Sequence, residues 1–163
     1  MTDAPALLAL LDKQAITEVI HRYCRAIDRR DEAALRGCFH DESTHDQGGF
    51  RGPSREFCGY ALAKLALIGA TQHLVSNLLI DVDQSNTTAR SEACFIAYHR
   101  LPASGVPDGL FASDGHVCDL FVGGRYLDQL RRHGTGWQIV QRTGIYDWVR
   151  RERADERAPG TSR

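Results

Sequence analysis

The sequence lacks the run of about 20 apolar residues that a helix needs to cross a bilayer. Its first residues (1–5) also lack the positive charges that open a secretion signal. An excess of charge of one sign is missing as well, because 20 Lys and Arg residues stand against 21 Asp and Glu residues. This balance argues against nucleic acid or an anionic membrane as a partner. We therefore expect a cytoplasmic protein.

Motifs that hold metal ions or phosphate groups are absent too. The five cysteines are widely spaced and form no C-x-x-C pair, which argues against a structural zinc site. His40 and His45 flank acidic residues, but their spacing matches no metal motif, so we interpret this segment as a solvated loop. The pair Arg29–Arg30 lacks a glycine pattern that could cradle a phosphate. We expect free thiols, no metal ion and no cofactor.

The composition is that of one globular domain. Hydrophobic residues make up 42% of the 163 residues, which is enough for one sizeable core, and no internal repeat is visible. The last residues, 150–163, are first charged and then contain proline and glycine, so we expect them to fray. The sequence therefore predicts a single domain over residues 1–149, followed by a flexible tail.

The first half of the chain has the apolar periodicity of helices. Between residues 7 and 27, apolar side chains recur at spacings that place them on one face of a helix. Asp31 can cap a short second helix. A third helix is predicted after the turn at residues 52–54, with Gly69 able to close it. The stripe on the first helix consists of Ile16, Val19, Ile20, Tyr23 and Ile27.

From residue 71 the pattern changes to alternating and β-branched residues. These runs predict one strand pair at 72–82 and 87–101 and another at 116–131 and 137–149. A short strand or hairpin arm is predicted over residues 43–51. Helices followed by long antiparallel strands indicate an α+β fold, with the helices on one face of a curved sheet. Such an arrangement encloses a cone-shaped cavity.

Three residues could carry chemistry in this cavity. Tyr23 lies on the apolar stripe, Asp28 lies at the edge of that stripe where the helix ends, and His73 opens the first long strand. Each also has a structural interpretation, as a core tyrosine, a helix-end aspartate and a satisfied histidine. Because side chains alternate along a strand, we expect Val75, Asn77 and Leu79 to share the face of His73.

Other polar side chains fall on the predicted strands, where they could line the cavity. They are Tyr98, His99, His116 and Tyr126, and for each of them a surface or core position is the alternative.

Several segments resemble a known family. They are LDKQAITEVIHRYCRAIDRRD (residues 11–31), TQHLVSN (71–77), GRYLD (124–128), GWQIV (136–140) and YDW (146–148). The chain resembles the SnoaL-like branch of the nuclear-transport-factor-2 superfamily over about residues 7–149. Within that branch it is similar to scytalone dehydratase, bile-acid 7α-dehydratase and hexachlorocyclohexane dehydrochlorinase. The resemblance implies a cystatin-like α+β cone, no cofactor, and a homo-oligomer, with a trimer favoured over a dimer.

The resemblance also implies roles for particular residues. In these enzymes an aspartate after the first helix pairs with a histidine on the following long strand, and Asp28 and His73 match those positions. The bile-acid enzyme has a tyrosine where Tyr23 lies, whereas the dehydrochlorinase has a lysine there. The bile-acid enzyme also uses an arginine late in the last strand. The corresponding position here is Tyr146, which we expect in the substrate pocket together with Tyr98, His116 and Tyr126.

These residues suit an elimination reaction. His73 would act as the base, Asp28 would orient its ring, and Tyr23 would donate a hydrogen bond or proton. We therefore expect a dehydratase-type lyase for a small apolar cyclic or aromatic substrate. A lyase that expels a small carbonyl fragment would use the same groups. Alternatives are a ketosteroid-type isomerase with Asp28 as its base, and a non-catalytic ligand-binding or assembly module of the same fold.

Overall fold

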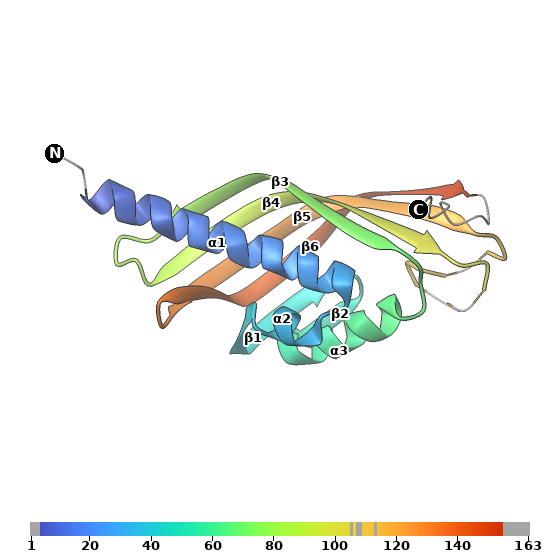
Figure 1. Cartoon of the computed structure of the whole chain (residues 1–163), viewed down its shortest axis with the longest axis horizontal. Coiled ribbons are helices and arrows are strands. Elements are labelled where there is room, and N and C mark those ends of the chain that lie inside the picture. Colours follow the sequence, from blue (N-terminus) through green and yellow to red (C-terminus); the bar gives the residue numbers. More distant parts are fainter. Residues whose placement is uncertain (1–3, 105, 107–108, 113, 155–163) are drawn as a thin grey trace, which may run out of the picture.

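The computed structural model describes residues 4–104, 106, 109–112 and 114–154. It confirms the predicted α+β class, with helices laid across one face of a single curved sheet (Figure 1). The six strands follow the order β2-β1-β6-β5-β4-β3. The elements are α1 (Ala4–Arg29), α2 (Glu32–Arg36), β1 (Phe39–Gln47), β2 (Phe50–Pro53), α3 (Ser54–Leu65), β3 (Thr71–Val82), β4 (Thr88–Leu101), β5 (Cys118–His133) and β6 (Gly136–Arg153).

The sheet differs from the expected antiparallel one in a single neighbouring pair. Strand β1 runs parallel to β6, with Phe39 opposite Ile139 and Thr44 opposite Gln141. All the other pairs of neighbouring strands in the described sheet are antiparallel. Parallel pairing needs a long crossover between the two strands, and here the chain from β2 to β5 provides it.

Helix α1 packs its apolar stripe against the sheet, as the periodicity predicts. All five residues of the stripe are buried. The helix ends where Arg30 adopts a left-handed conformation, with a φ of 54°. Asp31 then caps α2, because its Oδ1 accepts a hydrogen bond from the Ala34 backbone N–H at 3.0 Å.

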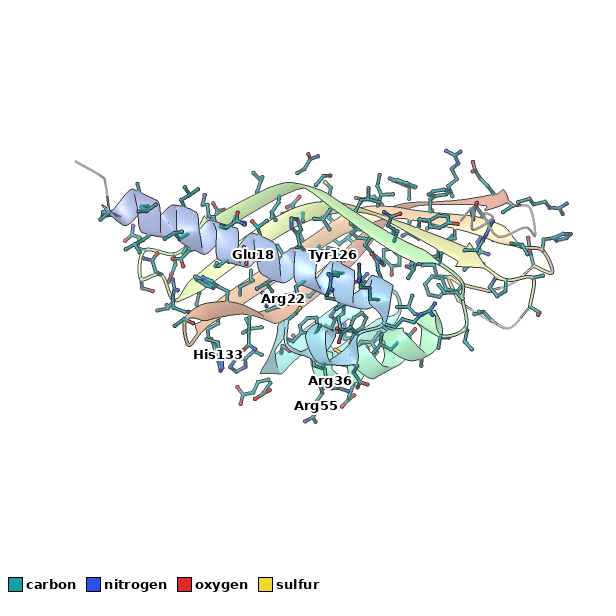
Figure 2. All side chains as sticks on the ribbon, viewed as in Figure 1. Glu18, Arg22, Arg36, Arg55, Tyr126 and His133 are labelled. Carbon is teal, nitrogen blue, oxygen red and sulfur yellow. The ribbon has the colours of Figure 1, made fainter. Side chains whose placement is uncertain are left out.

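Helices α2 and α3 are tied together at the side of the cone. The Arg36 side chain on α2 donates to the backbone carbonyl of Arg55 in the first turn of α3, at 3.1 Å (Figure 2). Helix α3 begins at Ser54 as predicted, but it ends at Leu65, before Gly69. Gly69 instead donates its N–H to the Arg100 carbonyl at 2.8 Å and so leads directly into β3.

A bulge in β3 changes which residues share the face of His73. The pairing with β4 shifts between Ser76 and Leu79, and Asn77 has a φ of 49°. One extra residue in a strand reverses the alternation beyond it. Leu79 is therefore 71% exposed and Ile80 is buried, so the predicted inward position of Leu79 is wrong.

The last strand is longer than the sequence indicates. Strand β6 continues to Arg153, opposite Cys118, which is four residues beyond the expected domain boundary at 149. The charged residues 150–153 form part of the ladder because β5 offers them backbone partners. Ala154 donates its N–H to the Val117 carbonyl at 3.0 Å. Residues 155–163 of the expected flexible tail lie outside the described residues.

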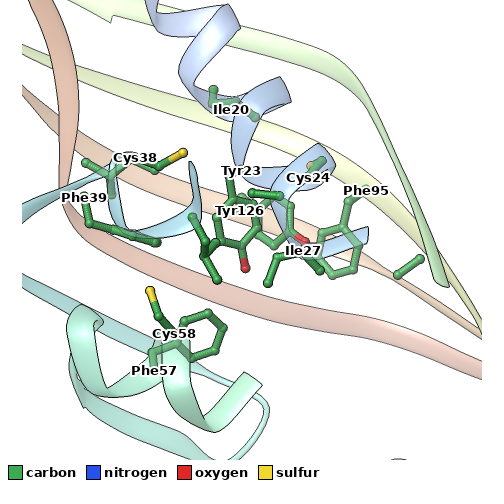
Figure 3. Close-up of a cluster of buried hydrophobic side chains, with 14 of the residues drawn as sticks. Ile20, Tyr23, Cys24, Ile27, Cys38, Phe39, Phe57, Cys58, Phe95 and Tyr126 are labelled. Carbon is green, nitrogen blue, oxygen red and sulfur yellow. The ribbon is translucent and has the colours of Figure 1, made fainter. Parts of the chain in front are cut away.

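None of the helices in the described part of the chain combines the length and the apolar character needed to cross a membrane. The core lies between α1 and the concave face of the sheet and extends to α2 and α3. Figure 3 shows its centre, where Tyr23 from α1 meets Tyr126 from β5. All five cysteines are free thiols, as expected.

Candidate active site

The structure brings Asp28 and His73 into direct contact. Asp28 Oδ1 lies 2.7 Å from His73 Nδ1, and Asp28 Oδ2 accepts the His73 backbone N–H at 2.9 Å. The side chains of His73 and Asp28 are only 9% and 20% exposed. A carboxylate at this distance is bound by a protonated Nδ1, so in the neutral ring the lone pair is on Nε2.

The loop before β3 holds His73 in this position. Arg30, directly after α1, donates from Nη2 to the carbonyls of Ile68 and Gly69 at 2.9 and 2.8 Å. These bonds tie the end of α1 to the chain that leads into β3. Asp28 and His73 are 45 residues apart in sequence, and this tie brings them together.

A cavity of about 130 Å³ lies beside His73, between the sheet, the end of α1 and α3. Its wall is largely apolar, with polar groups at a few positions, as is typical of small-molecule sites. The apolar part includes Ile27, Phe57, Leu65, Phe95, Phe111 and Val122. The polar part includes Tyr23, Gln47, Tyr60, Lys64, His73, His99 and Tyr146.

Tyr23 borders the cavity as predicted, although its side chain is 2% exposed. Its ring makes edge contacts with Phe39 and Tyr126, with centroids 5.9 and 5.7 Å apart. Burial raises the pKa of Tyr23 far above its usual value, and the charge of Arg142 opposes this effect only in part. The phenol therefore stays protonated and can act as a donor.

Arg142 and Asp128 form a fully buried ion pair beneath Tyr23, which the sequence analysis missed. Arg142 Nε and Nη2 donate to the two oxygens of Asp128 at 2.7 and 2.6 Å. The guanidinium lies 4.0 Å from the ring centre of Tyr23 and 4.4 Å from that of Tyr126. The two residues oppose each other on β5 and β6, so a correct strand register would have revealed the pair.

His99 is a second histidine in the cavity wall. It lies on β4 with its ring centre 5.5 Å from that of His73, and its Nδ1 lies 2.9 Å from the Thr71 hydroxyl. Burial lowers the pKa of His99 to about 3, with a smaller contribution from the charge of His73. His99 is therefore neutral near pH 7 and is a hydrogen-bonding group beside His73.

Of the four residues expected in the substrate pocket, Tyr146 lines the cavity and three do not. Tyr98 alternates with the inward-facing His99, so it lies on the outer face and donates to Asp119 at 2.8 Å. Tyr126 is fully buried beneath the cavity wall, stacked on Phe95 at 4.3 Å. His116 precedes β5 instead of lying in it, and its exposed side chain is 3.8 Å from Asp114.

His45 is also placed differently from the expectation of a solvated loop. It lies in β1, is 1% exposed, and stacks on Phe57 with ring centres 3.4 Å apart. Burial, followed by the charge of Arg142, lowers the pKa of His45 to about 3. Across the part of the chain that the structure describes, no three His, Cys, Asp or Glu side chains form a group that could hold a metal ion.

A comparison with models of protein families identifies the family of this chain. The model of the SnoaL-like domain matches residues 8–143, which include the three predicted catalytic residues. The chain belongs to the SnoaL-like domain family. The resemblance inferred from the sequence is thereby confirmed.

Solved structures share the fold. The dehydrochlorinase LinA-type3 from Novosphingobium barchaimii is 13% identical, with 95% of this chain and 99% of that chain covered and a TM-score of 0.76. A scytalone dehydratase-like protein from Novosphingobium aromaticivorans is 18% identical, with 92% of each chain covered and a TM-score of 0.72. A protein from Kribbella flavida is 22% identical, with 87% of this chain and 95% of that chain covered and a TM-score of 0.72. Identities this low establish the fold alone, and no curated protein matches the sequence.

Proposed function

We propose that the protein is a lyase of the dehydratase type that acts, without a cofactor, on a small apolar cyclic or aromatic substrate. The contact of 2.7 Å between Asp28 Oδ1 and His73 Nδ1, at the wall of an apolar cavity, carries this proposal. A base oriented by a carboxylate and a buried phenol are the groups that an elimination needs.

The proposed reaction removes a proton and a hydroxyl group from adjacent carbons, the first of them next to a carbonyl. His73 Nε2 takes the proton, and the electron pair of the broken C–H bond forms the C=C double bond as the C–O bond breaks. The departing oxygen takes a proton from the Tyr23 hydroxyl and leaves as water. Asp28 stabilises the imidazolium, whose proton returns to Tyr23 through solvent.

The family comparison supports an elimination. One structural neighbour is named a dehydrochlorinase and another a scytalone dehydratase-like protein, and both names describe the loss of a small group. An isomerase with Asp28 as its base has less support, because both carboxylate oxygens already bind His73. A non-catalytic binding module would not need the oriented histidine.

The test is turnover of a panel of small cyclic β-hydroxy ketones, followed by the ultraviolet absorbance of the enone product. We expect His73→Ala to lower the rate by about 10³-fold, the order of a general base contribution. His21→Ala is the matched control, because His21 lies on the exposed side of α1. Full turnover by His73→Ala, or no turnover of any panel member by the unmodified protein, would contradict the proposal.

We also propose that the protein is cytoplasmic and self-associates, as a trimer in preference to a dimer. A row of residues crosses the outer face of the sheet, where Leu74, Ile96 and Trp148 are each about half exposed. Leu74 pairs with Ile96, Ile96 with Gly123, and Gly123 with Trp148. An apolar row across four strands is a suitable contact surface for another copy.

A further inference from the structure

The cavity has a second polar wall, opposite the one that carries His73. Tyr146 on β6 and Gln47 on β1 border the cavity. In the strand order, both of these strands are separated from β3 by β5 and β4. Three strand spacings of about 4.8 Å separate β6 from β3, or roughly 14 Å along the sheet. Since the sheet curves around the cavity, the two walls face each other.

A chain of hydrogen bonds orients the hydroxyl group of Tyr146. His45 Nε2 lies 3.2 Å from Gln47 Oε1, and Gln47 Nε2 donates to Tyr146 Oη at 3.4 Å. The amide oxygen of Gln47 needs a donor, so the single proton of the neutral His45 ring lies on Nε2. His45 Nδ1, which has no hydrogen-bond partner among the described residues, is then unprotonated and carries the lone pair of the ring. Because Tyr146 Oη accepts from Gln47, its own proton is directed elsewhere.

Gly48 leaves the space that the Tyr146 hydroxyl occupies. A Cβ atom at Gly48 would lie 2.7 Å from Tyr146 Oη, closer than real contacts allow. Gly48 also has a φ of 60°, which favours glycine at this turn between β1 and β2. The turn residue and the hydrogen-bond chain therefore place the same phenol at the cavity wall.

We propose that Tyr146 anchors the ligand, its hydroxyl donating a hydrogen bond to a carbonyl or hydroxyl oxygen at the end remote from His73. Gln47 and His45 are positioning residues that keep the Tyr146 proton directed into the cavity. This inference deepens the proposed function, on which it rests for the reacting end of the substrate at His73. It adds that the substrate carries a second oxygen function.

The volume of the cavity limits the size of a ligand that can lie between the two walls. A volume of about 130 Å³ is close to that of the apolar cavities known to hold one benzene ring. Phe57, Phe95 and Phe111 supply flat apolar surface along the wall. The ligand class is therefore a one-ring compound with an oxygen acceptor on the Tyr146 side.

The experiment compares the binding of two unreactive probes by calorimetry. Acetophenone carries a carbonyl oxygen, and α-methylstyrene has nearly the same shape without it. We expect the unmodified protein to bind acetophenone about 2- to 10-fold more tightly, the factor that one net hydrogen bond supplies. Tyr146→Phe should bind both probes equally. Gln47→Glu should also abolish the preference, because a carboxylate would accept the Tyr146 proton.

Matched variants separate this proposal from the proposed function. Tyr98→Phe removes a hydroxyl on the outer face and should keep the preference for acetophenone. Both probes are unreactive, so a failure of turnover leaves this test intact. The proposal is overturned if Tyr146→Phe or Gln47→Glu retains the preference while its melting curve is native-like. It is equally overturned if the unmodified protein shows no preference or binds neither probe.

Discussion

The carboxylate of Asp28 binds His73 at two points, the ring Nδ1 at 2.7 Å and the backbone N–H at 2.9 Å. A carboxylate held by both oxygens cannot turn away from the ring without losing the backbone bond as well. The orientation of the imidazole and the start of β3 are therefore set by the same residue at the end of α1. This arrangement makes the tautomer of His73 a measurable property of the folded protein.

Asp28→Asn is expected to lower turnover by about 10³-fold while the protein stays folded. The amide can donate to Nδ1 and so favours the tautomer with its proton on Nε2, which cannot act as a base toward the cavity. Nitrogen NMR shifts of His73 report the tautomer directly. Asp41→Asn, an exposed change on β1, is the control, and an unchanged His73 spectrum in Asp28→Asn would rule out the orienting role.

Tyr23→Phe is expected to lower turnover by about 10²-fold or more, because it removes the proposed donor. The ring keeps its contacts with Phe39 and Tyr126, so the free energy of unfolding should change by no more than about 1.5 kcal/mol. Steady-state rates and urea denaturation of the same preparation measure the two effects. Unchanged turnover in this variant would remove Tyr23 from the mechanism.

Arg142→Met is expected to destabilise the protein by about 3–5 kcal/mol, because it leaves the Asp128 carboxylate buried without its partner. The double variant Arg142→Met/Asp128→Leu should be clearly more stable than the single one, since no unpaired charge remains. Denaturant unfolding of the four members of this cycle measures the coupling. If the changes in the free energy of unfolding of the two single variants add up in the double variant, the ion pair does not stabilise the core.

The stability of the protein should fall as the pH drops below about 6.5. Burial lowers the pKa values of His45 and His99 to about 3 in the folded protein, whereas both are near 6.5 in the unfolded chain. Between these values the unfolded state binds protons that the folded state does not, so acid favours unfolding. The slope for each histidine approaches about 1.4 kcal/mol per pH unit.

Urea unfolding between pH 7 and pH 5 measures this slope. His99→Gln should flatten it, because one of the two groups no longer titrates. His21→Gln, at an exposed site, should leave it unchanged. An equal slope in His99→Gln and the unmodified protein would contradict the assignment.

Ile96→Lys is expected to reduce the oligomer to a monomer by placing a charge in the apolar row of the outer face. Leu7→Lys, on the exposed first turn of α1, is the control and should leave the assembly intact. Light scattering after gel filtration measures the mass. A monomeric unmodified protein, or an Ile96→Lys variant that remains oligomeric, would refute the proposed contact.

Local patterns predicted much of the architecture. The stripe from Ile16 to Ile27 marked the buried face of α1, and Asp31 marked the cap of α2, because both signals depend on neighbours within a few turns. The parallel pairing of β1 with β6 and the bulge at Asn77 were missed. Neither has a strong local signature, since both depend on which strand lies alongside.

Tyr23, Asp28 and His73 were selected from the sequence because the segments that carry them, at the end of the first helix and the start of the first long strand, resemble the family. Buried and more exposed residues alternate regularly along β4. This pattern could have placed His99 on the inner face and Tyr98 on the outer face, but only once one inward residue of the strand was known. The sequence by itself determined the helices, the long strands and the family. Only the tertiary structure decided that Asp28 meets His73 and that Arg142 lies beneath Tyr23. Such contacts join residues far apart in the chain, and the register and curvature of the sheet decide which of them meet.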